Sequence, residues 1–149
     1  MPDLKQLYQE MILDHNKNPR NFGEIAHPTH KAEGYNPLCG DHYTIYLQVE
    51  GDKIVDVGFK GAGCAISKSS ASIMTSCLKG ATVEEARQMF DNFHRMLTRD
   101  TKPEELPGKL CKIIALQGVK DFPTRIKCAT LVWHTMKSAL NGETETTTE

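Results

Sequence analysis

The chain has 149 residues, of which 39% are hydrophobic and 25% charged, and its formal net charge at pH 7 is −1. This length and composition are typical of one globular domain with its own core. Such a charge offers no basic surface for nucleic acid, and no apolar run reaches the roughly 18 residues of a membrane span. Because the first residues lack the features of a signal peptide, we expect a cytoplasmic protein whose five cysteines are thiols or metal ligands rather than disulfides.

The first third of the chain predicts a helix, a loop and a hairpin. Apolar residues recur at helical spacing from Leu4 to Ile12, and Asn18-Pro19 ends that pattern. Residues 20–37 are rich in Pro, Gly, Asn and His and have no periodicity, which predicts a long loop. The segments 43–49 and 55–59 alternate between apolar and polar residues on either side of Gly51-Asp52, which predicts a β-hairpin.

Two helices are predicted after the hairpin. Gly61-Ala62-Gly63 interrupts the strand pattern, and Ser67 is the expected N-cap of a helix that Gly80 closes. The segment Thr82-Val83-Glu84-Glu85 is a capping box that opens the next helix. The residues expected to face the core are Ser70, Ile73, Met74, Cys77 and Leu78 in the first helix, and Val83, Ala86, Phe90, Phe93 and Leu97 in the second.

The remaining chain predicts an insertion, a short helix and a final long helix. Residues 98–108 are polar and hold two prolines, so we expect a surface insertion, followed by a helix from about 109 to 117. Pro123 suits the first position of the last helix. Strands come together and helices follow, which predicts an α+β fold with a small antiparallel sheet of about three strands packed against several helices. Residues 1–142 should form one domain, and 143–149 a disordered polar tail.

Three cysteines lie at the edges of the predicted elements, beside residues that suit chemistry. Cys39 and Asp41 are two residues apart, so on extended backbone their side chains point to the same side. Cys64 precedes a helix N-terminus, where the helix dipole favours a thiolate. Arg125 lies three residues before Cys128 and can share its helical face, where a guanidinium would offset negative charge. Taken singly, each position also fits an ordinary buried cysteine or surface charge.

Together, Cys39, Asp41, Cys64 and Cys128 offer three thiolates and one carboxylate, a set that suits tetrahedral zinc. His42 follows Asp41 and could support a ligand or replace one. Cys77 and Cys111 have apolar neighbours at helical spacing, so we expect both to pack in the core.

The chain contains three long motifs around these residues. They are Asn36-Pro37-Leu38-Cys39-Gly40-Asp41, the segment from Gly61-Ala62-Gly63-Cys64 to Ser72, and Arg125-Ile126-Lys127-Cys128-Ala129-Thr130-Leu131-Val132-Trp133. The three motifs resemble the IscU-like iron–sulfur cluster assembly proteins, and within them the SufU type. Ordinary scaffold members carry a His before the third cysteine, where this chain has Lys127, and the SufU type carries an insertion that fits residues 98–108.

The resemblance implies an IscU-like fold and a zinc-dependent sulfurtransferase that accepts persulfide sulfur from a PLP-dependent, SufS-like cysteine desulfurase and stimulates that enzyme. It implies Cys39, Asp41, Cys64 and Cys128 as zinc ligands, Cys39 as the sulfur acceptor, and Arg125 as an assisting residue. A downstream cluster assembly scaffold would be the second partner. Two alternatives remain: a scaffold that assembles a [2Fe–2S] cluster on the same residues, and a binding module with a purely structural zinc.

Overall fold

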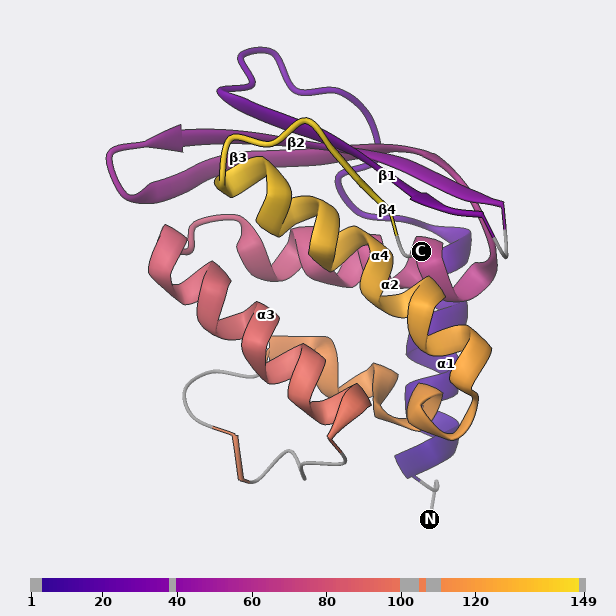
Figure 1. Ribbon diagram of the computed structural model, residues 1–149. Helices are drawn as coiled ribbons and strands as arrows, with labels where there is room; N and C mark the ends of the chain where they lie inside the picture. The colour runs from indigo at the N-terminus through magenta and orange to yellow at the C-terminus, as the bar shows by residue number, and fades with distance from the viewer. Residues whose placement is uncertain (1–3, 38–39, 100–104, 107–110, 148–149) are drawn as a thin grey trace.

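A twisted β-sheet lies against a layer of helices in the computed structural model (Figure 1), which describes residues 4–37, 40–99, 105–106 and 111–147. The strands are β1 (His30–Asn36), β2 (Asp41–Glu50), β3 (Lys53–Ala62) and β4 (Glu145–Thr147), arranged in the order β3-β2-β1-β4. The helices are α1 (Leu4–Lys17), α2 (Ala65–Leu78), α3 (Val83–Thr98), the 3₁₀ helix η2 (Cys111–Asp121) and α4 (Pro123–Leu140). The predicted α+β class is confirmed.

The predicted hairpin is present as the antiparallel pair β2 and β3. Its turn contains Gly51, whose positive φ of 63° suits a residue without a side chain. The prediction of a loop over residues 20–37 is wrong for its second half, because His30–Asn36 forms β1 and pairs antiparallel with β2. This strand is close to α4: a side chain in place of Gly34 would collide with Thr135. Close packing against a helix therefore explains a glycine that reads as a loop residue.

The end of the chain corrects the expectation of a disordered tail. Residues 145–147 form β4, which pairs parallel with β1 from Glu33 to Tyr35. The sheet is therefore mixed and four-stranded rather than antiparallel and three-stranded. The short strand covers part of the outer edge of β1, which would otherwise leave unpaired backbone groups.

The helix boundaries agree with most of the sequence signals. Thr82 caps α3 with the predicted capping box, in which Glu85 returns the hydrogen bond, and α4 begins at Pro123. The short helix expected near residues 109–117 is the 3₁₀ helix η2 at 111–121. Most of the expected insertion at 98–108 lies outside the described residues. No described helix is long and apolar enough to cross a membrane.

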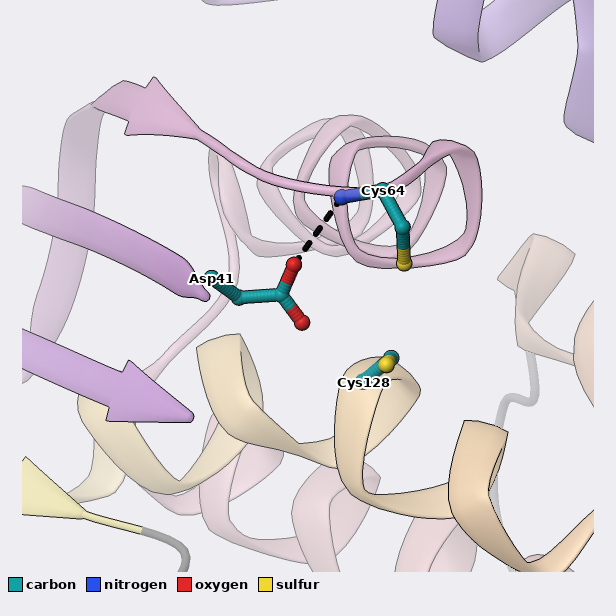
Figure 2. A group of neighbouring side chains, drawn as sticks. All are labelled: Asp41, Cys64 and Cys128. Carbon is teal, nitrogen blue, oxygen red and sulfur yellow. Dashed lines mark hydrogen bonds between the residues drawn. The ribbon is translucent and has the colours of Figure 1, made fainter. Parts of the chain in front are cut away.

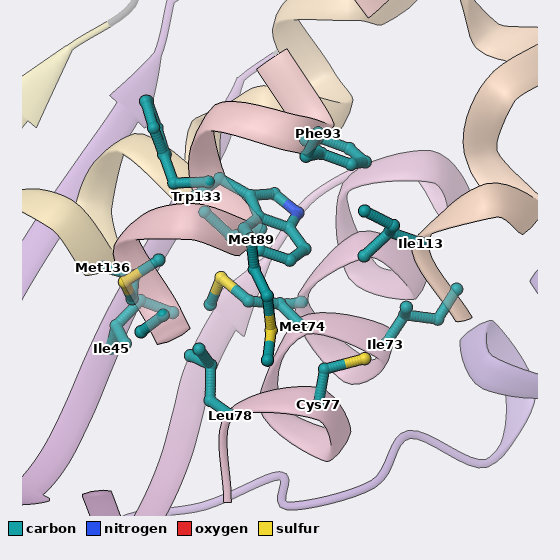
Figure 3. Close-up of a cluster of buried hydrophobic side chains, with 14 of the residues drawn as sticks. Ile45, Ile73, Met74, Cys77, Leu78, Met89, Phe93, Ile113, Trp133 and Met136 are labelled. Carbon is teal, nitrogen blue, oxygen red and sulfur yellow. The ribbon is translucent and has the colours of Figure 1, made fainter. Parts of the chain in front are cut away.

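The core lies between the sheet and helices α2, α3 and α4 (Figure 3). Trp133 of α4 is fully buried, stacks on Phe93 of α3 at a centroid distance of 4.6 Å and donates a 3.0 Å hydrogen bond to Ser70 Oγ of α2. The inward positions predicted for α2 and α3 are buried, apart from Val83, which is partly buried. These contacts fix α4 relative to α2, and both helices carry candidate site residues at or near their N-termini.

Polar contacts also hold α2 against α1. Ser69 Oγ donates a 2.6 Å hydrogen bond to the carbonyl of Ile12, and the buried His15 Nδ1 lies 2.7 Å from Ser72 Oγ. Buried polar side chains are costly unless they are paired, so these bonds favour one arrangement of the two helices. Helix α2 is thus held by polar contacts with α1 as well as by the hydrogen bond from Trp133 of α4.

Candidate metal centre

Asp41 begins strand β2 at the end of the sheet. Its side chain is buried on the face towards the helices, as are those of Tyr43 and Ile45 on the same strand. His42 lies between Asp41 and Tyr43 on the opposite face, where its ring stacks on Tyr35 at 4.3 Å and its Nε2 lies 3.8 Å from Glu33. Alternation along the strand therefore directs His42 away from the Asp41 carboxylate. The structure does not bring this histidine to the site.

Cys64 follows β3 and is itself the N-cap of α2. Its Sγ accepts a hydrogen bond from the backbone N–H of Ser67 at 3.5 Å. The prediction of Ser67 as the cap is therefore wrong by three residues. The difference matters because the capping atom is then itself a candidate ligand, whose position is set by an N–H group that has no partner within the helix.

Cys128 lies in the first turns of α4 and is fully buried. Its Sγ is 3.6 Å from Asn36 Nδ2 and 3.7 Å from the carbonyl oxygen of Thr124. Arg125 and Lys127 are exposed on the same helix segment. The structure thus separates a buried sulfur from two cations at the surface beside it.

Asp41, Cys64 and Cys128 converge although they come from three distant segments (Figure 2). One carboxylate oxygen and the two sulfurs all lie within 4.8 Å of one another, and this is the group of potential ligands found among the described residues. Cys39, the remaining predicted ligand, lies outside the described residues. The structure therefore brings together three of the four predicted ligand residues.

Each oxygen of Asp41 has its own hydrogen-bond donors. Oδ1 accepts from the backbone N–H of Cys64 at 2.9 Å and from Ser67 Oγ at 3.2 Å. Oδ2 accepts from Asn36 Nδ2 at 3.3 Å. The carboxylate orientation is therefore fixed by groups from β1 and from the first turn of α2.

Tyr43 adds a further hydroxyl to the hydrogen bonds around Asp41, through its contact with Ser67. Its hydroxyl lies 3.1 Å from Ser67 Oγ, and burial raises the pKa of Tyr43 to about 12. The phenol consequently stays protonated and can donate to Ser67 Oγ, which leaves the serine O–H to donate to Asp41 Oδ1 or to the Cys64 carbonyl, 3.0 Å from Ser67 Oγ. Sequence reasoning named Asn36 only within a motif, Tyr43 only as a strand residue, and Ser67 only as a cap and within a motif. Tyr43 could have been found from the sequence, because it is two residues after Asp41 on the same strand and therefore points to the same face.

Gly63 explains why no larger residue fits before Cys64. A Cβ atom at this position would collide with Asp41 Oδ1, lie 2.5 Å from Ser67 Oγ and lie 2.9 Å from Tyr43 Oη. Because Gly63 has no side chain, the side chains of Asp41, Ser67 and Tyr43 can meet next to the backbone that precedes Cys64.

The donor set has a definite chemical preference. Thiolates are soft ligands that bind zinc and iron, and a single carboxylate oxygen completes several known tetrahedral sites. Zinc–sulfur bonds are about 2.3 Å long, so ligand atoms that lie within 4.8 Å of one another can share one ion after small side-chain movements. The residues present therefore fit a tetrahedral ion once a fourth ligand is added.

Cys77 behaves differently from the site cysteines. It lies in the core on α2, as predicted, but it is disulfide-bonded, whereas Cys64 and Cys128 are in no disulfide. This corrects the expectation that all five cysteines are thiols or metal ligands. Cys77 is therefore not available as a further ligand.

Comparison with known protein families gives one match that covers the site. The sequence matches the NifU-like N-terminal domain family over residues 7–129, a range that includes all three converging residues. The chain belongs to this family, and the family expected from the three cysteine motifs is confirmed.

Two individual relatives show which members of the family the chain resembles. The chain is 40% identical to the zinc-dependent sulfurtransferase SufU of Bacillus subtilis, over 95% of this chain and 94% of that protein. It is 37% identical to the iron–sulfur cluster assembly scaffold protein IscU of Thermotoga maritima, over 91% and 94% of the two chains.

Solved structures agree with this grouping. A SufU from Fervidobacterium islandicum, described as an iron–sulfur cluster assembly scaffold protein for the SUF system, aligns with a TM-score of 0.80 at 40% identity and covers 88% of this chain and 94% of its own. The N-terminal part of a NifU-like protein from Brucella abortus aligns with a TM-score of 0.82 at 25% identity, over 91% and 92% of the two chains. The IscU-like fold expected from the sequence is thus confirmed.

Proposed function

We propose that this chain is a zinc-dependent sulfurtransferase of iron–sulfur cluster assembly. It accepts persulfide sulfur from a PLP-dependent cysteine desulfurase, stimulates that enzyme and hands the sulfur to a cluster assembly scaffold. The observation that carries the proposal is the convergence of Asp41, Cys64 and Cys128 within 4.8 Å in a chain 40% identical to a zinc-dependent sulfurtransferase.

The ligands of the proposed zinc are Cys39, Asp41, Cys64 and Cys128. Bound zinc keeps its cysteine ligands deprotonated and protects them from oxidation. Cys64 and Cys128 contribute as fixed ligands, because the first caps α2 and the second is buried within α4. Asp41 contributes the oxygen, which its three hydrogen-bond donors already orient.

We propose Cys39 as the sulfur acceptor. Its thiolate attacks the outer sulfur of the desulfurase persulfide, a new S–S bond forms on Cys39, and the desulfurase cysteine leaves as a thiolate. No external oxidant or reductant is needed, because one S–S bond replaces another. Burial of Cys128 keeps that sulfur away from a docked partner, which supports assigning the acceptor role elsewhere. The exposed Arg125 would offset the negative charge of the thiolates.

A second candidate is a scaffold on which a [2Fe–2S] cluster is assembled and then transferred. The 37% identity to the Thermotoga maritima IscU scaffold protein favours it, and the same thiolates would ligate iron. Lys127 argues for the zinc form, because an exposed ammonium stands where scaffold members carry a potential histidine ligand. A purely structural zinc is the third candidate.

One assay separates these functions. The purified zinc form is mixed with a cysteine desulfurase, cysteine and reductant; sulfide release is measured, and mass spectrometry locates any persulfide. We expect persulfide on Cys39 and several-fold stimulation of sulfide release, both lost in Cys39→Ser. The matched control, Cys111→Ser, changes a cysteine that is not among the proposed ligands.

Three results would point elsewhere. Full stimulation by Cys39→Ser without persulfide would overturn the proposal. A bound iron–sulfur chromophore that passes to an apo-acceptor would favour the scaffold. Zinc whose removal changes only the melting temperature would favour a structural role.

A further inference from the structure

The side chain of Asn36 lies between two of the converging residues. Asn36 ends β1 and is completely buried, and its Nδ2 lies 3.3 Å from Asp41 Oδ2 and 3.6 Å from Cys128 Sγ. We propose that Asn36 is a positioning residue, which holds the Asp41 carboxylate and the Cys128 sulfur in the geometry that binds the ion. This inference rests on the proposed zinc site and adds a residue that acts through two of its ligands.

A neutral primary amide is suited to this place. It carries two N–H donors on one nitrogen, so it can serve an oxygen and a sulfur at the same time. It adds no charge to a site that collects thiolates and a carboxylate. A lysine or arginine could donate as well, but its charge would oppose a cation at the same site.

The two carboxylate oxygens of Asp41 have different hydrogen-bond donors. Oδ1 accepts from both the backbone N–H of Cys64 and the hydroxyl of Ser67. Oδ2 accepts only from Asn36 among the bonds that the structure shows, which leaves it acceptor capacity on the side of the two sulfurs. Asn36 therefore selects Oδ2 as the oxygen presented to the ion and holds it in that direction.

The contact with Cys128 has a different effect. A protonated Sγ can donate to the Thr124 carbonyl 3.7 Å away, but a metal-bound sulfur has no proton to donate. The amide N–H of Asn36 can still donate to it, so this contact persists in the ligating form. Residues behind metal ligands act in this way by fixing ligand orientation.

The backbone of Asn36 keeps its side chain in place. Asn36 is the β1 residue paired with Asp41 on β2, and its carbonyl accepts a 2.9 Å hydrogen bond from the N–H of Gly40. The amide is thus held on the strand pair that carries Asp41 and reaches across to α4. It connects the two parts of the site that the sheet and the last helix supply.

The test compares zinc affinity and ligand geometry in Asn36→Ala and in the isosteric Asn36→Asp. Affinity is measured by competition with a chromophoric chelator, and geometry by the sulfur-to-metal charge-transfer bands of the Co²⁺-substituted protein. We expect zinc binding to weaken on the order of 10–100-fold, with shifted Co²⁺ bands. The matched control is Asn92→Asp, another completely buried asparagine, on α3, which supplies no candidate ligand. It should keep wild-type affinity and bands.

The outcomes separate this inference from the proposed function. Wild-type affinity and bands in the Asn36 variants would overturn the inference, and so would an equal loss in Asn92→Asp, because a general effect of burial would then explain both. If the wild-type chain binds no zinc, the proposed site itself fails. It also fails if Asp41→Ala and Cys128→Ser bind zinc as tightly as the wild type. Circular dichroism of the metal-free variants checks folding, and Asn36→Asp keeps the test open if the alanine variant does not fold.

Discussion

Asp41 Oδ1 accepts a 2.9 Å hydrogen bond from the backbone N–H of Cys64, which joins the first residue of β2 to the N-cap of α2 across 23 positions of sequence. The carboxylate therefore has a structural task as well as a place among the candidate ligands. Its Oδ1 satisfies a backbone donor next to the helix start, while Oδ2 faces the two sulfurs (Figure 2). Substitutions at Asp41 should separate these two tasks.

Asp41→Ala should lower both stability and metal affinity, whereas Asp41→Asn should mainly lower affinity. Alanine removes the acceptor of the Cys64 N–H and one acceptor of the Asn36 amide, and an unpaired buried group costs about 1–3 kcal/mol. Asparagine keeps one carbonyl oxygen for Cys64 but loses the charge. Urea unfolding of the metal-free proteins measures the first effect, and chelator competition the second. Equal stability of Asp41→Ala and the wild type would contradict the structural task.

Gly63→Ala should weaken metal binding because its methyl group would collide with the groups that orient Asp41. The new Cβ meets Asp41 Oδ1, Ser67 Oγ and Tyr43 Oη, so the carboxylate must turn. We expect an affinity loss of about tenfold or more, as for other residues that orient ligands.

Gly118→Ala is the matched control for Gly63→Ala. A Cβ at this position of η2 meets nothing within 4 Å, so zinc affinity should be unchanged. Stability should stay the same or rise by up to about 1 kcal/mol through the unfolded chain. Comparable losses of affinity in both variants would argue against the steric explanation.

His134 should make the protein less stable as the pH falls below neutrality. Burial lowers the pKa of His134, and the neighbouring His94 and Lys137 lower it further. The unfolded chain then takes up a proton near the ordinary pKa of about 6.5 while the folded protein does not. Stability is therefore lost from about pH 7 downwards until the folded histidine also titrates.

His134→Gln tests this origin of the pH dependence. Chemical unfolding between pH 7.5 and 5 should give a shallower fall in stability for this variant than for the wild type. His27→Gln, which changes an exposed histidine, should keep the wild-type slope. If the two variants show the same slope, burial of His134 does not control this part of the profile.

Trp133 offers a test of the core that positions α4 against α2. Trp133→Phe keeps an aromatic ring against Phe93 but loses the N–H donated to Ser70 Oγ, which should cost about 1 kcal/mol. Trp133→Ala also opens a cavity and should cost about 3–5 kcal/mol. Thermal unfolding followed by circular dichroism measures both. A phenylalanine variant as unstable as the alanine variant would show that the hydrogen bond matters more than the ring volume.

Local signals accounted for much of the fold. The capping box at Thr82, the turn at Gly51 and the proline that opens α4 are each decided by neighbours within a few residues, and the structure contains all three. The converging Asp41, Cys64 and Cys128 were also predicted, because each lies in a motif with its own chemical character.

Features that depend on distant contacts were missed. The sequence of β1 has no strand-like alternation, and it extends because β2 supplies hydrogen-bond partners and α4 packs against Gly34. The three residues of β4 are polar and become a strand only beside β1. His42 was a possible ligand until the face occupied by each residue of β2 was known.

The sequence by itself determined the chemistry of the candidate site, because residue types and spacing already specify which thiolates and carboxylate can be offered. Only the tertiary structure decided how they are presented. It placed Cys64 at the cap of α2, divided the donors between the two oxygens of Asp41 and put the amide of Asn36 against Cys128. Ligand identity is a property of single residues, whereas ligand orientation depends on hydrogen bonds between segments that only folding brings together.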